Sequence, residues 1–442
     1  MTLPSAGVAP IRRGMHGRDF DFLIVGGGIT GCVMASLLVN RKLAAPGRVA
    51  IVAGGAQPAP VPVVADSDWD LRVFALSRAS QRLLTLCGVW QLLPAQKYNA
   101  YERMCVWDAR GGSPRGGPPE GSGSLNFDCA ELGEPNLGYI VEGRALQTAC
   151  RHAATAAGAV FIDAGILEIL VDEDHVRVSL SDDRDLQGQL LIAADGVESR
   201  ARKLLGIDTA GHAYHQDALV AHVRTAISHR NTAWQRFLPT GPLAFLPLPD
   251  GRSSIVWSTA RPEALRLRSL DAAAFAAELC VASGEFLGAC EVTTPIASFP
   301  LKLQYALDYV RPRAVLVGDA AHAVHPLAGQ GLNLGLLDCA VLAEVLGCDD
   351  RGDPRGGDGF GGPVRFGEHK LLRRYERRRK SENVLAATAF DGLERLFSND
   401  SAVLTPLRIA GLGAVGRVPF VKRELATRAL GLSGDVPAFL RD

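Results

Sequence analysis

DFLIV-GGGITG-CVMASLLVNRKL, residues 21–43, is the stretch that decides the fold predicted for this chain. Its first five residues are typical of a buried strand, the glycines predict a turn, and the apolar residues from Cys32 onward predict a helix. The apolar run RVAIV at 48–52 predicts the next strand. A strand–helix–strand unit of this kind indicates a parallel sheet covered by helices.

The turn in this stretch matches the pattern G-x-G-x-x-G, which occurs three times, beginning at Gly26, Gly357 and Gly411. Only the first copy follows a strand-like run and precedes a helix-like one, as the pattern requires. There the first glycine permits the tight turn, Gly28 lets the backbone approach a pyrophosphate, and Gly31 lets the helix pack closely on the strand. The free N–H groups at the start of the helix favour phosphate charge. A glycine-rich turn without a ligand is the alternative.

Composition limits the class of protein. Lys plus Arg and Asp plus Glu each total 47, so no overall field would attract nucleic acid. The nine cysteines include no C-x-x-C pair, which indicates reduced, mostly buried thiols in a cytosolic protein. The uncharged run 22–40 could mimic a membrane span or an export signal, but the glycines near its start would break such a helix. We therefore expect a cytoplasmic protein with a flexible leader at 1–18.

The remaining sequence predicts a second unit that is mostly antiparallel. Short apolar runs separated by acidic turns at 160–195 predict a β-meander, and further strand-like runs fill 212–260. RAVLVGD at 313–319 predicts another buried strand, and a helix follows from about 331 to 346. Beyond this helix and a Gly-rich loop, the pattern is mainly helical to the end of the chain.

Two further motifs place an Asp and glycines after a strand. LIAADGVESRAR at 191–202 puts Asp195 and Gly196 at the end of a buried strand, a pair that also favours a plain β-turn. VGDAAHAVHPLAGQGLNLGLLD at 317–338 is the most specific motif of the chain. Its Asp can accept hydrogen bonds from a sugar-like polyol, and its glycines let a flat ring lie on the backbone. The helix that follows can stabilise negative charge on a reduced flavin by about 0.3–2 kcal/mol.

These three blocks, in this order, resemble the flavoprotein aromatic hydroxylases. Five shorter stretches resemble more narrowly the ubiquinone-biosynthesis hydroxylases that act on polyprenylated phenols. They are DLRVFALS at 70–77, MCVWD at 104–108, LGYIVEGRAL at 137–146, WQRFLPTGPLAFLPL at 234–248 and LERLFSND at 393–400. The resemblance extends from about residue 19 to 441 and leaves out only the leader and the Gly-rich stretches 111–124 and 349–367.

The resemblance implies an α/β fold, in which a Rossmann-like FAD-binding domain carries an inserted, mostly antiparallel β-sheet substrate domain and C-terminal helices. It implies an enzyme that uses FAD, NADPH or NADH, and O2 to place one oxygen atom on the aromatic ring of a polyprenylated phenol. The expected division is 19–98, 138–208 and 304–348 for the FAD-binding domain, 99–137 and 209–303 for the substrate domain, 349–367 for a Gly-rich loop and 368–442 for a C-terminal helical region.

The same resemblance assigns residues to the cofactor. Asp195 and Gly196, with Arg202, would serve FAD and NAD(P)H, and Asp319 would hold the ribityl chain. No catalytic side chain and no metal are assigned, because the cofactor carries the chemistry. The positions expected at the ADP part and elsewhere along FAD are Gly26, Gly28, Gly31, Arg72, Arg144, Gln147, Asp195, Gly196, Arg202, Gly318 and Asp319. Those expected to flank the isoalloxazine ring are Pro326, Gly329, Gly331, Leu332 and Asn333.

One feature of the expected site departs from the family's usual pattern. The family usually ends its second strand with an acidic residue that binds the adenosine ribose, whereas this chain has Ala53 there. Asp66 or Asp68 could replace it, with a solvated loop as the simpler account. Ionising a phenol at pH 7 costs about 4 kcal/mol without help. The candidate bases, by residue type alone, are His212, His215 and His222, and a structural role is the alternative for each.

Several weaker signals have simpler explanations. His322 and His325 are spaced like a metal pair, but no third ligand accompanies them at a usual spacing. The run RRYERRRK at 373–380 is most simply a solvated helix face rather than a site for anionic lipid. Residues 402–442 suit the core of a helical bundle, with a peripheral contact to the inner membrane as the alternative.

Two other functions are weighed against the hydroxylase. A halogenase or reductase would share the fold, but the halogenase signature W-x-W-x-I-P is absent. A non-catalytic binder would have lost the flavin-facing Gly329 and Gly331. The expected partners are therefore a polyprenyl phenol and, as open alternatives, a membrane surface and the ubiquinone-biosynthesis complex, with no nucleic acid.

Overall fold

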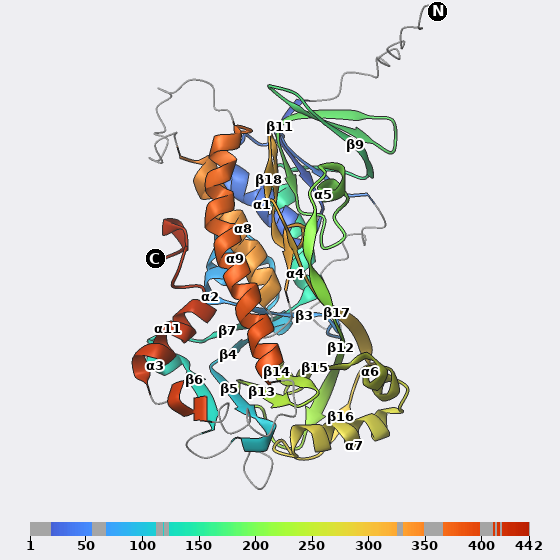
Figure 1. Ribbon diagram of the computed structural model, residues 1–442, viewed down its shortest axis with the longest axis vertical. Coiled ribbons are helices and arrows are strands. Elements are labelled where there is room, and N and C mark those ends of the chain that lie inside the picture. The colour runs from blue at the N-terminus through green and yellow to red at the C-terminus, as the bar shows by residue number, and fades with distance from the viewer. Residues whose placement is uncertain are drawn as a thin grey trace, which may run out of the picture.

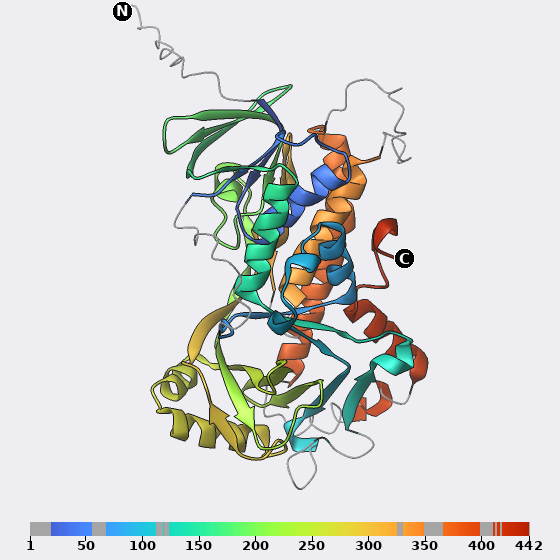
Figure 2. The ribbon, with the colours of Figure 1, turned by 180° about the vertical axis from the view of Figure 1, so that it is seen from behind.

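The computed structural model describes residues 19–54, 68–111, 118, 123–324, 330–348, 366–397, 410–411, 413–415 and 418–441. Figures 1 and 2 show an elongated molecule, with a helix-covered parallel sheet at one end and an antiparallel sheet at the other. Helix α9 (His369–Phe397) runs along the long axis and connects the two ends.

The parallel sheet is built around the strand that opens the predicted βαβ unit. β1 (Asp19–Val25) pairs in parallel with β2 (Val49–Val52) on one side and with β11 (Asp185–Ala193) on the other. The order is β18-β19-β11-β1-β2-β8, with β10 and β9 attached in antiparallel fashion beside β11. The remaining bounds are β8 (Val160–Ile162), β9 (Ile166–Val171), β10 (Val176–Leu180), β18 (Val310–Arg311) and β19 (Ala314–Leu316). The central strands are buried on both faces, which explains their continuous apolar sequence.

Helices cover this sheet. α1 (Ile29–Asn40) packs against α4 (Gly143–Ala156) and α8 (Gln330–Leu346). α8 also contacts α9 and α2 (Arg78–Leu86). α1 begins earlier than the predicted Cys32, because Gly28 already serves as its N-cap. The short α5 (Arg200–Leu204) follows the end of β11.

The second sheet has nine strands in the order β20-β17-β12-β15-β14-β13-β5-β6, with β16 beside β12. Its neighbours are antiparallel except for β13 and β5, and α6 (Arg261–Arg268) and α7 (Ala272–Ser283) pack beside it. The bounds are β5 (Arg103–Asp108), β6 (Ser124–Asp128), β12 (Thr209–Thr225), β13 (Thr232–Leu238), β14 (Gly241–Pro247), β15 (Ser253–Ala260), β16 (Cys290–Val292), β17 (Ala297–Ala306) and β20 (His322–Ala323). The expected boundary between residues 303 and 304 falls inside β17.

A small third sheet joins the two ends. It has the order β3-β7-β4, with β3 (Val73–Leu76), β7 (Gly138–Glu142) and β4 (Tyr98–Tyr101). Trp69, Ile140 and Leu248 form a buried cluster that packs this sheet onto the nine-stranded one. The short α3 (Cys129–Leu132) follows β6, and α11 (Pro419–Ala429) lies beside β6 and α3 (Figure 1).

The basic run at 373–380 forms the predicted solvated helix face only in part, with Arg373 and Arg377 exposed. Tyr375, Glu376 and Arg379 are buried, because this part of α9 packs along α8. Nε of Arg379 lies 2.7 Å from a carboxylate oxygen of Asp338 in α8. Successive charges on a helix point in different directions, so the ones that face α8 become buried and need acidic partners.

Within the described residues, no helix is both long and apolar enough to cross a bilayer. The uncharged run 22–40 forms a strand, a turn and a short helix instead. All nine cysteines are free thiols, and five of them are buried. The Gly357 copy of the glycine pattern lies outside the described residues.

Candidate active site

The glycine turn at 26–31 meets the steric demands predicted for it. Gly26 has a φ of +113°, and a Cβ there would lie 2.3 Å from the carbonyl oxygen of Ala194. A Cβ at Gly31 would lie 2.0 Å from the carbonyl oxygen of Gly26, so glycine is what lets α1 approach the strand. A Cβ at Gly28 would meet nothing within 4 Å, which leaves this backbone open to a bound group. The first turn of α1 has no side-chain cap and no acidic residue, so its N–H groups can face a phosphate.

The strand that follows ends without an acidic side chain. Ala53 comes directly after β2, and its N–H donates to the carbonyl oxygen of Ile162 in β8 at 3.0 Å. Asp66, one of the suggested replacements, lies outside the described residues. The carboxylate of Asp68 is exposed and lies 3.8 Å from the guanidinium of Arg252, near the turn between β14 and β15. Asp68 therefore faces the antiparallel sheet, which gives it a partner other than a ribose.

Arg72, Arg144 and Gln147 gather at the start of α4. The carbonyl oxygen of Arg72 accepts a hydrogen bond from the N–H of Gly143 at 2.8 Å. Arg144 is exposed, with its Nε 3.9 Å from a carboxylate oxygen of Asp70, and Gln147 follows one turn later on the same face of the helix. Exposed guanidinium groups of this kind are suited to bind phosphate oxygens.

The motif after β11 is held by internal hydrogen bonds. The carboxylate of Asp195 accepts hydrogen bonds from the hydroxyl of Ser199 and, at 3.0 Å, from the N–H of Ala201. The buried Arg202 donates to the carbonyl oxygens of Val197 at 2.9 Å and of Ala320 at 2.8 Å. Arg202 thereby ties this turn to the one that contains Asp319. The predicted contacts of these residues, and of Gly196, with FAD and NAD(P)H stay predictions.

The Asp of the third motif, Asp319, lies in the turn between β19 and β20. Gly318, which precedes it, has a φ of +59°, and a Cβ there would lie 3.1 Å from the side chain of Thr30 in α1. The side chain of Asp319 is exposed, yet the surrounding protein desolvates it and raises the pKa of its carboxyl, while the nearby His322 and Arg72 oppose that rise. An accessible carboxylate at such a turn is suited to accept hydrogen bonds from the hydroxyls of a polyol.

A buried ionic network that we did not predict supports this turn. The carboxylate of Asp338, in α8, accepts hydrogen bonds from the N–H of Gly318 at 3.0 Å, Nε of Arg379 at 2.7 Å and Nδ2 of Asn383 at 3.1 Å, and it lies 2.6 Å from Nε2 of His322. Burial alone would raise the pKa of Asp338, but His322 and Arg379 lower it to about 2. Asp338 ends the quoted motif and so carried a signal, whereas Arg379 and Asn383 come from α9, far along the chain. His322 is thus committed to a carboxylate, and His325 lies outside the described residues.

The start of α8 combines a predicted ring-flanking segment with a structural amide. Gly331 and Leu332 are partly exposed. Asn333 is nearly buried, with its Oδ1 accepting from the N–H of Ser77 and its Nδ2 donating to the carbonyl oxygen of Ala75, both at 2.9 Å. Its amide therefore fastens α8 to β3 and α2. The two other predicted ring-flanking positions, Pro326 and Gly329, lie outside the described residues.

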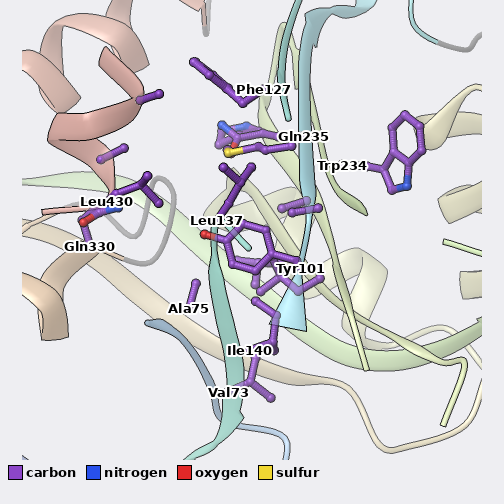
Figure 3. Close-up of a pocket in the computed structure, with 18 of the residues that line it drawn as sticks. Val73, Ala75, Tyr101, Phe127, Leu137, Ile140, Trp234, Gln235, Gln330 and Leu430 are labelled. Carbon is purple, nitrogen blue, oxygen red and sulfur yellow. The ribbon is translucent and has the colours of Figure 1, made fainter. Parts of the chain in front are cut away.

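A mostly apolar cavity of about 280 Å³ lies between the small sheet and the antiparallel sheet (Figure 3). Val73 and Ile140 line one side, and Ala244 and Val256 line the other. One end reaches Gln330, which lies within the predicted ring-flanking segment, and the inner face of α11. None of the described residues that line it is Asp, Glu, Lys, Arg or His. An apolar cavity with a few polar groups is typical of a small-molecule site.

The three histidines proposed as candidate bases do not line this cavity. His222 is fully buried, and its ring nitrogens have neither a partner among the described residues nor surface that water could touch. Burial, with nearby Arg252, lowers the pKa of His222 to about 4. His212 lies 3.3 Å from a carboxylate oxygen of Asp391, and His215 is exposed on β12. A structural role therefore suits them better.

The chain is similar to known proteins over most of its length. The FAD binding domain family matches residues 120–356. The ubiquinone hydroxylase UbiL of Rhodospirillum rubrum is 36% identical, over 99% of this chain and 96% of its own. The 3-demethoxyubiquinol 3-hydroxylase of Escherichia coli (strain K12) is 34% identical, over 95% of this chain and 100% of its own. The mitochondrial ubiquinone biosynthesis monooxygenase COQ6 of Homo sapiens is 31% identical, over 92% of this chain and 91% of its own.

Solved structures confirm the predicted α/β fold. The p-nitrophenol 4-monooxygenase PnpA from Pseudomonas putida DLL-E4 superposes with a TM-score of 0.68 at 16% identity, covering 95% of this chain and 100% of that one. PqsL, a probable FAD-dependent monooxygenase from Pseudomonas aeruginosa, gives 0.66 at 21% identity, covering 89% and 99%. At such identities the likeness concerns the fold alone. The sequence relatives confirm the predicted FAD cofactor and enzyme class, and the chain belongs to the FAD binding domain family and, within it, to the FAD-dependent monooxygenases of ubiquinone biosynthesis.

Proposed function

We propose that this enzyme uses FAD, NAD(P)H and O2 to hydroxylate the aromatic ring of a polyprenylated phenol, a precursor of ubiquinone. The observation that carries the proposal is the mostly apolar cavity, which has no charged side chain among its described lining residues and reaches Gln330 within the predicted flavin-flanking segment. The relatives of this chain are named as hydroxylases of ubiquinone and demethoxyubiquinol.

The residues around the nucleotide-type turn fit FAD. The open backbone at Gly28 and the uncapped start of α1 would receive the pyrophosphate. Arg72 and Arg144 would balance its charge, and Asp319 would hold the ribityl hydroxyls. Bound there, FAD would supply the electron transfer and oxygen activation. The part of the chain that would bind the cofactor consists of residues 19–98, 138–208 and 304–348. The part that would bind the substrate consists of residues 99–137 and 209–303.

The cavity supports a neutral aromatic ring as the substrate. Burying a carboxylate without a charged partner is costly, and none of the described residues that line the cavity is a cation, so an aromatic acid is disfavoured here. The same apolar walls favour binding of an isoprenoid chain, with a free energy of roughly 25 cal/mol for each Å² of its apolar surface removed from water. The same walls keep water away from the reacting groups, which limits side reactions.

The outer face of α11 supports a peripheral contact with a membrane. Ala426 and Leu430 turn inward and line the cavity, while Phe420 is 79% exposed and Leu425 is also exposed. The exposed Arg423 and Arg428 belong to the same helix. A short helix that presents apolar and basic residues together is suited to an anionic bilayer surface, the source of a polyprenylated substrate. Contact with other ubiquinone-biosynthesis enzymes rests on the sequence alone.

Isotopically labelled O2 tests the hydroxylation directly. Purified protein with FAD should oxidise NAD(P)H slowly by itself and faster with a short-tailed prenyl phenol, and one labelled oxygen atom should appear on the ring. If prenyl phenols neither stimulate the oxidation nor gain oxygen while another class of substrate does, the proposal is wrong.

Vesicle flotation tests the membrane contact. The wild type should float with vesicles of anionic phospholipid, and Phe420→Ser with Leu425→Ser should reduce the bound fraction while FAD content stays the same. Equal flotation of the wild type and the double variant would contradict a role for α11.

A further inference from the structure

The cavity contains a few polar side chains, and most of them are already engaged or turned away. Gln330 accepts a hydrogen bond from Nδ2 of Asn333 at 3.4 Å. The indole of Trp234 points away from the cavity in Figure 3, and its Nε1 is buried. Ser258 is 1% exposed and almost closed off from the space. This leaves Tyr101 and Gln235 as the polar groups with the best access.

Both remaining groups lack a partner within the described part of the protein. No hydrogen bond is made there by the hydroxyl of Tyr101 or the side-chain amide of Gln235, although Gln235 is only 7% exposed. Both groups are accessible to a molecule in the cavity, because both residues line it. A nearly buried amide without a partner is unusual, since buried polar groups are normally hydrogen-bonded.

The fold directs the two groups into the same space from different sheets. Gln235, in β13, pairs with Ala244 of β14, which pairs with Val256 of β15, so these three side chains share the sheet face that lines the cavity. Tyr101 comes from β4 opposite Gly138, where a Cβ would lie 3.0 Å from the tyrosine hydroxyl. The missing side chain of Gly138 makes room for this ring. In Figure 3 the hydroxyl and the amide point the same way, toward the side of Gln330 and Leu430.

We infer that Tyr101 and Gln235 bind the oxygen substituents of the substrate ring and thereby orient it, an inference that rests on the proposed function. Burial raises the pKa of Tyr101 to about 12, so the tyrosine stays a neutral hydroxyl at pH 7. A neutral hydroxyl can donate to a ring oxygen, and a carboxamide can accept from a phenol or donate to an ether oxygen. Two such contacts from opposite walls fix which ring carbon faces the flavin side of the cavity.

A matched pair of probes tests this assignment in the FAD-loaded enzyme. The probes are 2-prenylphenol and prenylbenzene, which lacks the hydroxyl, and their dissociation constants are read from changes in the flavin absorption spectrum. Tyr101→Phe and Gln235→Met should each weaken 2-prenylphenol by about tenfold, because a polar group is left unpaired. Binding of prenylbenzene should change by less than about twofold, because this probe has no oxygen atom that could bind either side chain.

Tyr98→Phe is the matched control. Tyr98 begins the same strand but lies on its opposite face, packed against Trp90 with ring centroids 5.0 Å apart. This variant should bind both probes as the wild type does. The two cavity variants should also convert a smaller fraction of consumed NAD(P)H into hydroxylated product, which a purely structural change would not single out.

The outcomes separate the inference from the proposed function. Equal weakening of both probes, or no weakening of 2-prenylphenol, would overturn the assignment of Tyr101 and Gln235 while leaving the proposed function intact. If the wild type binds neither probe and hydroxylates no prenyl phenol, both the assignment and the proposed function fall.

Discussion

The glycine turn of the nucleotide half and the cavity of the antiparallel half carry function in different ways. The turn is one contiguous segment, in which the backbone itself is shaped by Gly26 and Gly31. The cavity is assembled from side chains of the small sheet, of β13 to β15, of α11 and of Gln330. A backbone site can be recognised from a local pattern, whereas a side-chain site depends on which strands become neighbours.

The largest effect is expected at Arg379, which tests the contrast between a local backbone site and an assembled side-chain site. Although it lies far along the chain in α9, its contact with Asp338 supports the nucleotide half. Arg379→Met leaves the buried Asp338 without its arginine partner, and breaking a buried pair of this kind costs about 3–5 kcal/mol. Chemical denaturation should show this loss. The control is Arg377→Met, at an exposed position of the same helix. It should change the unfolding free energy by less than about 0.5 kcal/mol, as surface substitutions usually do.

Two alanine substitutions in the turn should separate folding from binding. A Cβ at Gly31 would lie 2.0 Å from a backbone oxygen, so Gly31→Ala should destabilise the protein by about 3 kcal/mol. Gly28→Ala meets no atom within 4 Å and should cost less than about 1 kcal/mol of stability, yet it should weaken FAD binding by covering the open backbone. Thermal unfolding and flavin content measure the two effects. Similar behaviour of the two variants would remove the distinction.

Asp319→Ala tests the polyol contact. Removing this accessible carboxylate should cost about 1.5–3 kcal/mol of FAD binding, because charged hydrogen bonds are lost. Titration of FAD into the apo-protein measures it. A variant that keeps all its flavin through dialysis would refute the role of Asp319.

The Asp338 network predicts an acid-sensitive part of the stability. The pKa of Asp338 is lowered from 3.8 to about 2 in the folded protein. The ionised carboxylate therefore stabilises the fold above pH 4, and this contribution is lost as the pH falls toward 2. The loss amounts to about 2 kcal/mol. The difference in unfolding free energy between the wild type and Asp338→Asn should shrink by this amount over that range. A difference independent of pH would contradict the assigned ionisation.

Ala53→Glu tests the smallest effect. A carboxylate at the end of β2 normally binds ribose hydroxyls, so the variant should bind FAD about tenfold more tightly, a gain of about 1.4 kcal/mol. Unchanged or weaker binding would mean that the ribose already has a partner. Because Asp68 faces Arg252, Asp66→Ala would then be the next variant to measure.

The sequence predicted the parts of the molecule whose reason is local. The βαβ unit, the β-meander after 160 and the helix at α8 follow from apolar periodicity and glycines. The burial of Arg379 was missed, because a charged run looks solvated until a partner helix is placed beside it. Tyr101 and Gln235 were missed for a similar reason. They meet only when β4 and β13, more than a hundred residues apart in the chain, face the same space.

The central claim is that the cavity accepts a neutral prenylated phenol because none of the described residues that line it carries a charge. It is tested most directly by comparing 2-prenylphenol with the same molecule carrying a ring carboxylate, as substrates of the FAD-loaded enzyme with labelled O2. We predict that the neutral phenol accelerates NAD(P)H oxidation and gains one labelled oxygen, while the carboxylated phenol does neither. Equal or preferred hydroxylation of the carboxylated phenol would contradict the account.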